Sequence, residues 1–291
     1  MRKLFVCIAL GLTTLTGNAA SPLWMRDVQI SPDGTEIAFC YKGDIYKVSA
    51  GGGTAIQLTT QPSYECTPIW SPDSKQIAFA SDRNGNFDIF VMPATGGTAQ
   101  RLTTHSSSEL PSAFTPDGKY ILFSASIQDP SQSALFPTTA MTELYKVPVN
   151  GGRTEQVLGT PAEAVCYAPS GEFFLYQDRK GFEDEWRKHH TSSITRDIWL
   201  YDTKTGKHTN LTNHAGEDRN PVLSPDGKSV YLLSERKGSF NVYSFPLDNA
   251  QDLKAVTSFK THPVRFLSMS HGGTLCLSLI HISEPTRLQL I

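Results

Sequence analysis

Short runs of apolar residues recur along the chain, and each follows a cluster of turn-forming residues. The run at residues 76–80 (QIAFA) has the length of a strand buried between neighbouring sheets and is too short for a core helix. The turn before it is Ser-Pro-Asp-Gly or a close variant. Proline presets φ in such a turn, aspartate can bond the turn backbone, and glycine takes a positive φ. This pattern predicts many short strands and, beyond residue 20, no sustained helix.

The apolar runs belong to a repeated unit of five elements in fixed order. The turn is followed by the apolar strand, a second strand that begins with Asp-Ile-Tyr or a similar triplet, a Gly-Gly pair and a segment ending in Leu-Thr. The turn falls at residues 31–34, 71–74, 115–118, 168–171 and 224–227, and a sixth unit begins at Phe266. Four short strands in about 40 residues are the anatomy of a propeller blade.

We therefore expect an all-β fold, a six-bladed β-propeller of four-stranded blades, with the last blade truncated. A β-sandwich with regularly spaced turns is the alternative. The ordered recurrence of five separate elements disfavours it.

The first 20 residues have the layout of a secretory signal peptide. Arg2 and Lys3 precede an apolar stretch at residues 4–15, and small residues follow at 17–20. The stretch is short of the ~20 residues that span a bilayer. We expect cleavage after Ala19 or Ala20, a periplasmic or secreted protein, and no membrane span after cleavage.

The repeats resemble the WD40-like propellers of the TolB protein and of tricorn-type proteases, over roughly residues 24–276. The signal peptide runs directly into residues 24–28 (WMRDV), which leaves no room for the N-terminal α/β domain that TolB carries. The chain is more similar to the N-terminal propeller of a bacterial tricorn-like serine peptidase. In that family a PDZ domain and a catalytic domain follow the propeller, and they hold the catalytic residues.

The C-terminal segment does not continue the blade pattern. Residues 277–287 (LSLIHISEPTR) match the translation of a transposase adapter used to prepare sequencing libraries. We therefore expect residues 21–276 to be the propeller, incomplete at blade six, and residues 277–291 to be adapter read-through that is not native. Such segments are set aside when the fold is considered.

The composition of the chain limits the classes of partner and cofactor that we expect. The net charge is -2, with no basic run, which argues against nucleic acid. The four cysteines after residue 20 have no zinc-ligand spacing, and a buried thiol is the commoner reading of Cys40 and Cys166. No motif that activates a serine, a cysteine or a metal-bound water occurs. We assign no catalytic residue, no metal and no cofactor.

The segment at residues 82–88 (DRNGNFD) has oxygen-bearing side chains at alternate positions, as in a small calcium turn. It also falls between the second and third strands of blade two. A hairpin rich in Asn and Gly is expected there, and we favour that reading.

Two neighbouring blades carry long insertions between their second and third strands, at residues 124–142 and 178–196. These loops leave the same face of a propeller, so we expect them to form a raised rim beside the channel, where binding residues often lie. The alternative is that they cover a blade edge or a neighbouring domain. The candidate peptide-binding residues are Phe182, Glu183, Trp186, His189 and His190, with the two histidines read as exposed loop residues rather than metal ligands.

The sequence favours a non-catalytic propeller fragment of an exported tricorn-like peptidase, which recognises or gates peptides for PDZ and protease domains absent from this chain. A stand-alone, TolB-like periplasmic protein-binding module is the alternative. A prolyl-oligopeptidase-type propeller is a third reading.

Overall fold

The computed structural model describes residues 25–127, 141–182, 192–260, 262–281 and 284–290. The predicted signal peptide lies outside these ranges. The described chain is all-β, with five four-stranded antiparallel sheets and one three-stranded sheet.

The five complete sheets follow one another along the chain. Blade one comprises β1 (Arg26–Ile30), β2 (Glu36–Tyr41), β3 (Asp44–Ser49) and β4 (Ile56–Gln57). Blade two comprises β5 (Glu65–Trp70), β6 (Gln76–Ser81), β7 (Asp88–Pro93) and β8 (Gln100–Arg101). Blade three comprises β9 (Glu109–Phe114), β10 (Tyr120–Ala125), β11 (Glu143–Pro148) and β12 (Glu155–Leu158). Blade four comprises β13 (Glu163–Tyr167), β14 (Phe173–Gln177), β15 (Ile198–Asp202) and β16 (His208–Asn210). Blade five comprises β17 (Asp218–Leu223), β18 (Ser229–Ser234), β19 (Asn241–Pro246) and β20 (Lys254–Ala255).

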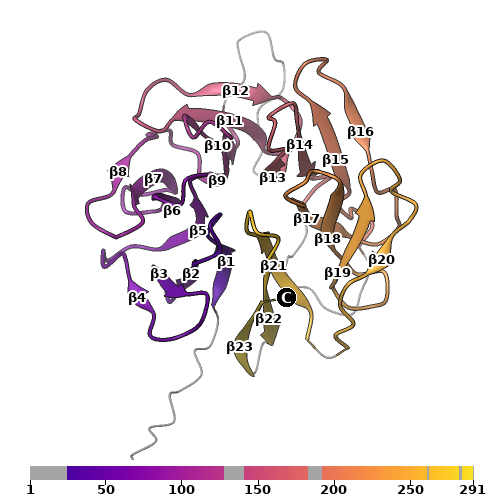
Figure 1. The fold of residues 1–291 in the computed structure, drawn as a ribbon. Coiled ribbons are helices and arrows are strands. Elements are labelled where there is room, and N and C mark those ends of the chain that lie inside the picture. Colours follow the sequence, from indigo (N-terminus) through magenta and orange to yellow (C-terminus); the bar gives the residue numbers. More distant parts are fainter. Residues whose placement is uncertain (1–24, 128–140, 183–191, 261, 282–283, 291) are drawn as a thin grey trace, which may run out of the picture.

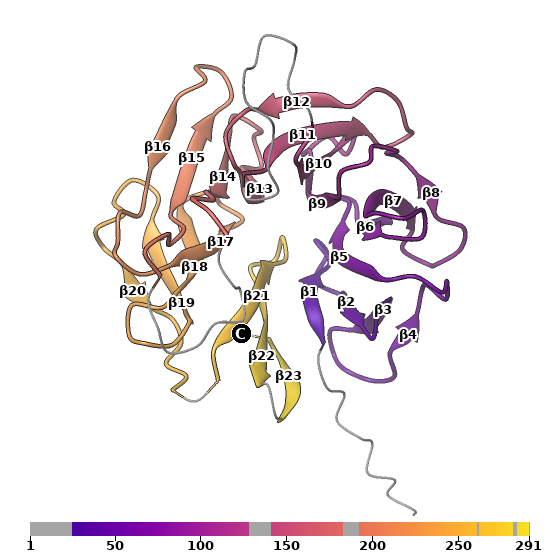
Figure 2. The same cartoon turned by 180° about the vertical axis from the view of Figure 1, so that it is seen from behind.

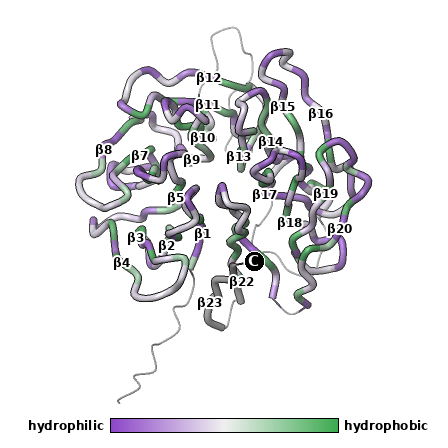
Figure 3. The backbone as a smooth tube through the Cα atoms, viewed as in Figure 1, coloured by the Kyte–Doolittle hydropathy of each residue, from purple (hydrophilic) through white to green (hydrophobic). Residues whose placement is uncertain are grey.

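The sheets are arranged in a ring, with the first strand of each nearest the centre (Figures 1 and 2). This is the propeller that the repeats predict. Many of the strands contain hydrophobic stretches, and hydrophilic residues are common in the connecting loops (Figure 3). In the described part of the chain, no helix has the length and apolar character needed to cross a membrane.

The Ser-Pro-Asp-Gly turn is held by its own side chains. In blade one, Ser31 Oγ donates to Asp33 Oδ1 at 2.6 Å, and the backbone N–H of Thr35 donates to the same carboxylate at 2.9 Å. Gly34 has φ +78°, which suits glycine. These hydrogen bonds favour the ionised carboxylate and lower the pKa of Asp33. The equivalent aspartates of blades two, three and five bond in the same way, with serine or threonine as the donor.

The Leu-Thr ending has a structural role that explains its recurrence. In blade two, Thr103 Oγ1 accepts a hydrogen bond from the backbone N–H of Ile89 at 2.9 Å. The same bond joins Thr59 to Ile45, Thr212 to Ile198 and Thr257 to Val242, each at 2.9 Å. The threonine thus fastens the short outer strand to the beginning of the third strand.

Hydrophobic clusters lie between neighbouring blades. Phe79 and Phe90 of blade two pack with Cys40 and Ile45 of blade one, and similar clusters join each further pair. The ring is closed by contacts between the sixth sheet and blade one. Cys276 is buried with Val28 in one cluster, and the backbone N–H of His271 donates to Pro32 O at 2.7 Å.

The expectation of six blades is corrected by the structure. Among the described residues the complete four-stranded blades number five, and the sixth sheet has three strands, β21 (Val264–Met269), β22 (Leu275–His281) and β23 (Glu284–Leu290). β22 therefore continues past Cys276 and pairs with β23, so the segment we expected not to continue the blade lies largely in strands. The physical reason is its own alternation of side chains. Leu275 and Leu277 are buried against blade five, in a cluster with Leu233 and Val242.

Candidate functional site: the channel mouth

The first strands of all six sheets line a cavity of about 250 Å³ at the end of the ring where the second strands finish. We call it the insertion mouth, because the insertions of blades three and four begin and end beside it. Its charged lining side chains are the acids Asp27 and Glu163 and the bases Arg179, Arg219 and Arg265. The wall of this one cavity therefore carries both acidic and basic side chains.

A β-bulge interrupts the first strand of every sheet at this mouth, so that two residues face one on the second strand. In five of the six strands the first bulge residue is a non-glycine with positive φ, and the five are Asp27, Thr67, Ala164, Asn220 and Phe266. Blade three has Pro111 at this position, and the ring of proline does not permit a positive φ. These bulges aim the lining side chains at the cavity and place strained backbone there.

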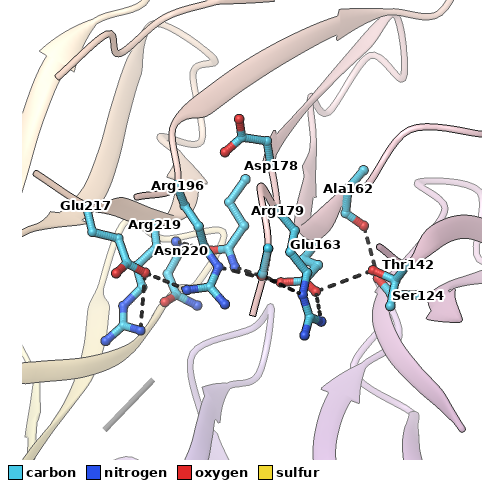
Figure 4. Close-up of polar contacts among 12 residues, drawn as sticks. Ser124, Thr142, Ala162, Glu163, Asp178, Arg179, Arg196, Glu217, Arg219 and Asn220 are labelled. Carbon is cyan, nitrogen blue, oxygen red and sulfur yellow. Dashed lines mark hydrogen bonds and ion pairs between the residues drawn. The ribbon is translucent and has the colours of Figure 1, made fainter. Parts of the chain in front are cut away.

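Glu163 joins the bases of the two insertions (Figure 4). Thr142, which ends the blade-three insertion, donates to Glu163 Oε1 at 3.4 Å. Arg179, at the start of the blade-four insertion, contacts the same oxygen at 2.8 Å. Arg196, at the end of that insertion, lies 3.8 Å from Glu163 Oε2. One carboxylate on the channel wall thus contacts both loops.

The network continues into blade five. Arg196 Nη1 lies 2.7 Å from Glu217 Oε1, and Arg219 Nη1 lies 3.7 Å from the same oxygen. The side chains of Arg196, Glu217 and Arg219 are nearly fully buried, and a buried ion pair of this kind is held by its partners rather than by water. Arg219 also lies over the ring of Phe240, at 4.2 Å from its centroid. The wall of the mouth is therefore rigidly positioned.

A second contact set fixes the base of the blade-four insertion. Lys180 Nζ lies 2.6 Å from Asp197 Oδ2 and 3.6 Å from Asp178 Oδ2. The backbone N–H of Asp197 donates to Asp178 Oδ1 at 2.7 Å, and the indole N–H of Trp199 donates to Asp178 Oδ2 at 3.2 Å. Burial is the largest effect on Asp178 and raises its pKa. These bonds bring the two ends of the insertion together.

The predicted rim residues fall mostly outside the described part of the chain. Glu183, Trp186, His189 and His190 lie outside it, whereas Phe182 is described and the residue is 76% exposed. The structure brings together the bases of the two insertions, as their position on neighbouring blades predicts. Sequence reasoning missed Glu163, Arg196, Glu217 and Arg219. Aligning the repeats on the first strand would have shown charged residues recurring there.

The segment at residues 82–88 forms the hairpin between β6 and β7. Gly85 N donates to Asp82 O at 2.8 Å, and Asp82 Oδ1 accepts from Tyr64 N at 2.7 Å. Asp88 lies 2.7 Å from Arg101 Nη2. The carboxylates of the suggested calcium turn are thus engaged with protein partners, as the hairpin reading predicts.

The four described cysteines are Cys40 and Cys276, which are buried, and Cys66 and Cys166, which are half-buried. Burial is the main cause that raises the pKa of Cys40 and of Cys276 to about 12 and that of Cys166 to about 11. These thiols are therefore protonated and poorly nucleophilic at neutral pH.

Comparison with known families identifies the propeller. Residues 22–276 match the tricorn protease N-terminal β-propeller domain. The chain belongs to this family. The tricorn-type propeller also overlaps two curated relatives in part. It is 32% identical over 72 residues to the uncharacterized peptidase YuxL of Bacillus subtilis, covering 25% of this chain and 10% of that protein. It is 31% identical over 108 residues to the uncharacterized protein Atu1656 of Agrobacterium fabrum, covering 37% of this chain and 33% of that protein. The matches thus span a third or less of either relative.

Solved structures share the fold of this tricorn-type propeller. The crystal structure of the tricorn protease superposes with a TM-score of 0.72 at 20% identity, over 92% of this chain and 26% of that one. TolB from Acinetobacter baumannii gives a TM-score of 0.64 at 20% identity, over 89% of this chain and 64% of that one. The β-propeller domain of the Trilobed protease from Pyrococcus furiosus gives 0.57 at 15% identity, over 91% and 78%.

Proposed function

We propose that this chain is the non-catalytic propeller of an exported, tricorn-like serine peptidase and that it recognises peptides at the insertion mouth. The observation that carries the proposal is the Glu163 network, which joins both insertion bases to a cavity lined by acids and bases. A peptide backbone and its mixed side chains offer complementary groups to such a wall. The buried ion pairs hold those groups in place before a ligand arrives, which lowers the entropic cost of binding.

The exposed insertion residues extend this site. Phe182 projects from the base of the blade-four insertion and offers apolar surface. We propose that Glu183, Trp186, His189 and His190 line the rim with it and contact peptides before they enter the mouth. Trp186 is the strongest candidate for an anchor, because tryptophan is enriched among residues that dominate interface energies.

The family membership supports a wider proposal about the parent protein. Residues 1–20 act as a signal peptide, and the propeller works in the periplasm or outside the cell. PDZ and protease domains of the parent chain are its partners, and it needs no cofactor of its own. The sheet β21–β22–β23 represents the sixth blade, and its native sequence diverges from this chain after Cys276.

A stand-alone protein-binding module of the TolB type is the second candidate, favoured by the structural likeness to TolB. The two candidates differ in ligand. A peptidase propeller binds unfolded peptides of many sequences, whereas a stand-alone module captures a particular folded protein.

Peptide binding at the mouth is tested with Leu110→Ala. Leu110 lines the insertion mouth and the residue is 40% exposed, so removal of its side chain should perturb the fold little. We expect fluorescein-labelled peptides of about ten residues, from a casein digest, to bind the purified chain in anisotropy titrations. The variant should weaken their binding by about 1–3 kcal/mol, the range of an interface anchor.

The matched control is Ile56→Ala. Ile56 is 58% exposed on β4, an outer strand, and it should not affect peptide affinity. Equal affinities in both variants and the unsubstituted chain would place binding elsewhere. No peptide binding at all, together with capture of one folded protein, would favour the stand-alone module.

A further inference from the structure

A second cavity, of about 460 Å³, occupies the opposite end of the channel, where the Ser-Pro-Asp-Gly turns converge. We call it the turn mouth. Its rim carries one proline from each of the five turns, namely Pro32, Pro72, Pro116, Pro169 and Pro225. Proline has no backbone N–H, so at five positions this rim offers no main-chain donor to water or to a ligand.

The wall of the turn mouth is apolar and rich in rings. Trp70, Phe114 and Tyr167 line it together with aliphatic residues of the first strands, Ile30 and Leu223 among them. Of the described residues that line it, none is Asp, Glu, Lys or Arg, and the one basic side chain is that of the exposed His271. This composition contrasts with the insertion mouth, whose wall holds Asp27, Glu163 and three arginines. The channel is therefore polarised along its length.

The polar atoms of this wall are largely engaged within the protein. The indole N–H of Trp70 donates to Gln29 O at 3.0 Å. Ser112 Oγ accepts from Val165 N at 2.8 Å, and Cys166 Sγ accepts from Leu223 N at 3.3 Å. Burial raises the pKa of Tyr167 to about 12, so its hydroxyl stays neutral. Apart from the exposed His271, the described lining offers no side chain of opposite charge, so a charged ligand would lose its hydration here without compensation.

The two cavities adjoin. Gln29, Ile69 and Ser112 line both of them, at the middle of the first strands. A ligand group seated in the turn mouth can therefore belong to a chain that extends into the insertion mouth.

We propose that the turn mouth is a specificity pocket for one bulky, uncharged side chain of the bound peptide, aromatic before aliphatic. The inference rests on the proposed function, since it assigns part of the same peptide to this end of the channel. The volume lies within the roughly 300–1,000 Å³ of ligand pockets, which are mostly apolar with few polar groups. Aromatic ligands gain ring contacts with Trp70, Phe114 and Tyr167 beyond the effect of buried area.

The test uses blocked single amino acids, which are too small to need the insertion mouth. N-acetyl-phenylalaninamide should bind the purified chain, measured by saturation-transfer NMR and calorimetry, and N-acetyl-leucinamide should bind more weakly. The aspartate and lysine analogues should show no saturable binding. Intrinsic fluorescence should change on binding of N-acetyl-leucinamide, which has no ring of its own, and Trp70→Phe should remove that change.

Ala113 provides an isosteric pair of variants. Ala113 is half-buried and lines the turn mouth. Ala113→Asp should weaken binding of the phenylalanine amide at least tenfold, because it places an unpaired charge in the apolar wall. Ala113→Asn, with the same shape and no charge, should stay within a few-fold of the unsubstituted chain. If Ala113→Asp does not fold, the Trp70→Phe fluorescence measurement still decides.

The outcomes separate this inference from the proposed function. Leu110→Ala should leave amide binding unchanged while weakening the longer peptides. Absence of amide binding, or equal binding of the aspartate and phenylalanine analogues, overturns the pocket, even where peptides still depend on Leu110. Amide binding without any peptide binding upholds the pocket and rejects the proposed function. A dimer that Ala113→Asp dissociates, in a chain that binds no amide, overturns the pocket and makes the turn mouth an interface between copies.

Discussion

At the scale of single residues, blades two to five each begin with an acid that faces the last residue of the second strand. Glu65 in blade two contacts Arg83 at 3.0 Å, and Ser81 Oγ donates to it at 2.9 Å. Asp218 in blade five likewise lies 2.6 Å from Arg236. In blade three the corresponding neighbours of Glu109 are the apolar residues Ala125 and Ile127. Glu109 is 1% exposed, and one of its carboxylate oxygens is buried without a hydrogen bond. Glu65 and Asp218 also have one such oxygen, so what sets them apart is the close arginine.

Burial raises the pKa of Glu109 to about 7, and the nearby carboxylate of Asp88 adds to the effect, which Thr103 and Arg101 oppose. Because the folded-state pKa lies above the unfolded value of 4.5, the folded state holds the proton more tightly. The contribution of Glu109 to stability is therefore greatest below the unfolded pKa and is lost as the pH rises through the folded pKa.

Glu109→Gln should remove this loss. We expect the variant to be more stable than the unsubstituted chain at pH 8, by roughly 1–3 kcal/mol, the cost of a buried unpaired polar group. The gain should shrink as the pH falls towards 5. Urea unfolding at several pH values measures it. The matched control, Glu65→Gln, should destabilise at pH 8 because Glu65 has its arginine, and a stabilising effect of both variants would refute the comparison between blades.

At the scale of elements, the first strands carry the feature that shapes the site. Each has a bulge beside the insertion mouth, and five have a left-handed non-glycine residue there. The residue types involved, Asp, Thr, Ala, Asn and Phe, share no chemistry. The ring of neighbouring strands therefore imposes the conformation, against the preference of most of these residues.

Ala164→Gly tests that view. Ala164 has φ +48°, a region costly for alanine and open to glycine. Glycine relieves roughly 1–2 kcal/mol of left-handed strain, and its greater freedom in the unfolded chain costs about 0.4–1 kcal/mol. The variant should therefore raise the free energy of unfolding by about 0.5–1 kcal/mol. Ala113 also lies in a first strand, but its φ is not positive. Ala113→Gly should therefore lower the free energy of unfolding. Thermal and chemical unfolding of both variants provide the comparison, and destabilisation by Ala164→Gly would show that no strain is stored at this bulge.

The repeated elements explain which parts of the fold were predictable. Turn residues such as Asp33 and the recurring threonines make local bonds within one blade, so the same pattern appears in each unit. The Glu163 network could not be read in this way. Its members come from blades three, four and five, and only the packing of neighbouring blades brings Thr142, Arg196 and Glu217 together. The strand pairing after Cys276 was not predicted, because the segment was set aside on its expected origin although Leu275, Leu277 and Leu279 alternate with other residues.

At the scale of the whole molecule, the sixth sheet completes the ring. Its first strand contacts blade one through Ser268 Oγ, which accepts from Ile30 N at 3.1 Å. Its second strand covers blade five, where Leu277 is fully buried beside Val242. Residues beyond Cys276 thus take part in closure, whatever their origin.

Ending the chain after Cys276 should therefore destabilise it. Burial of the Leu277 side chain alone contributes about 1.5–3 kcal/mol to the free energy of unfolding, and this is lost with the segment. The loss of β23 also leaves an open strand edge, which promotes aggregation. A chain with the native continuation of the sixth blade should be the most stable of the three. Melting temperatures compare the stability of the three chains, and light scattering compares their aggregation. Equal stability with and without residues 277–291 would mean that β22 and β23 contribute nothing to closure.

The central claim is that the propeller recognises peptides through its channel. Hydrogen–deuterium exchange with and without a saturating casein-derived peptide tests it most directly, because it reports every blade at once. We expect added protection in the first strands, above all around the bulges at Thr67, Ala164 and Asn220, and none in the outer strands β4, β8 and β20. Protection confined to the outer strands, or no change at saturating peptide, would contradict it.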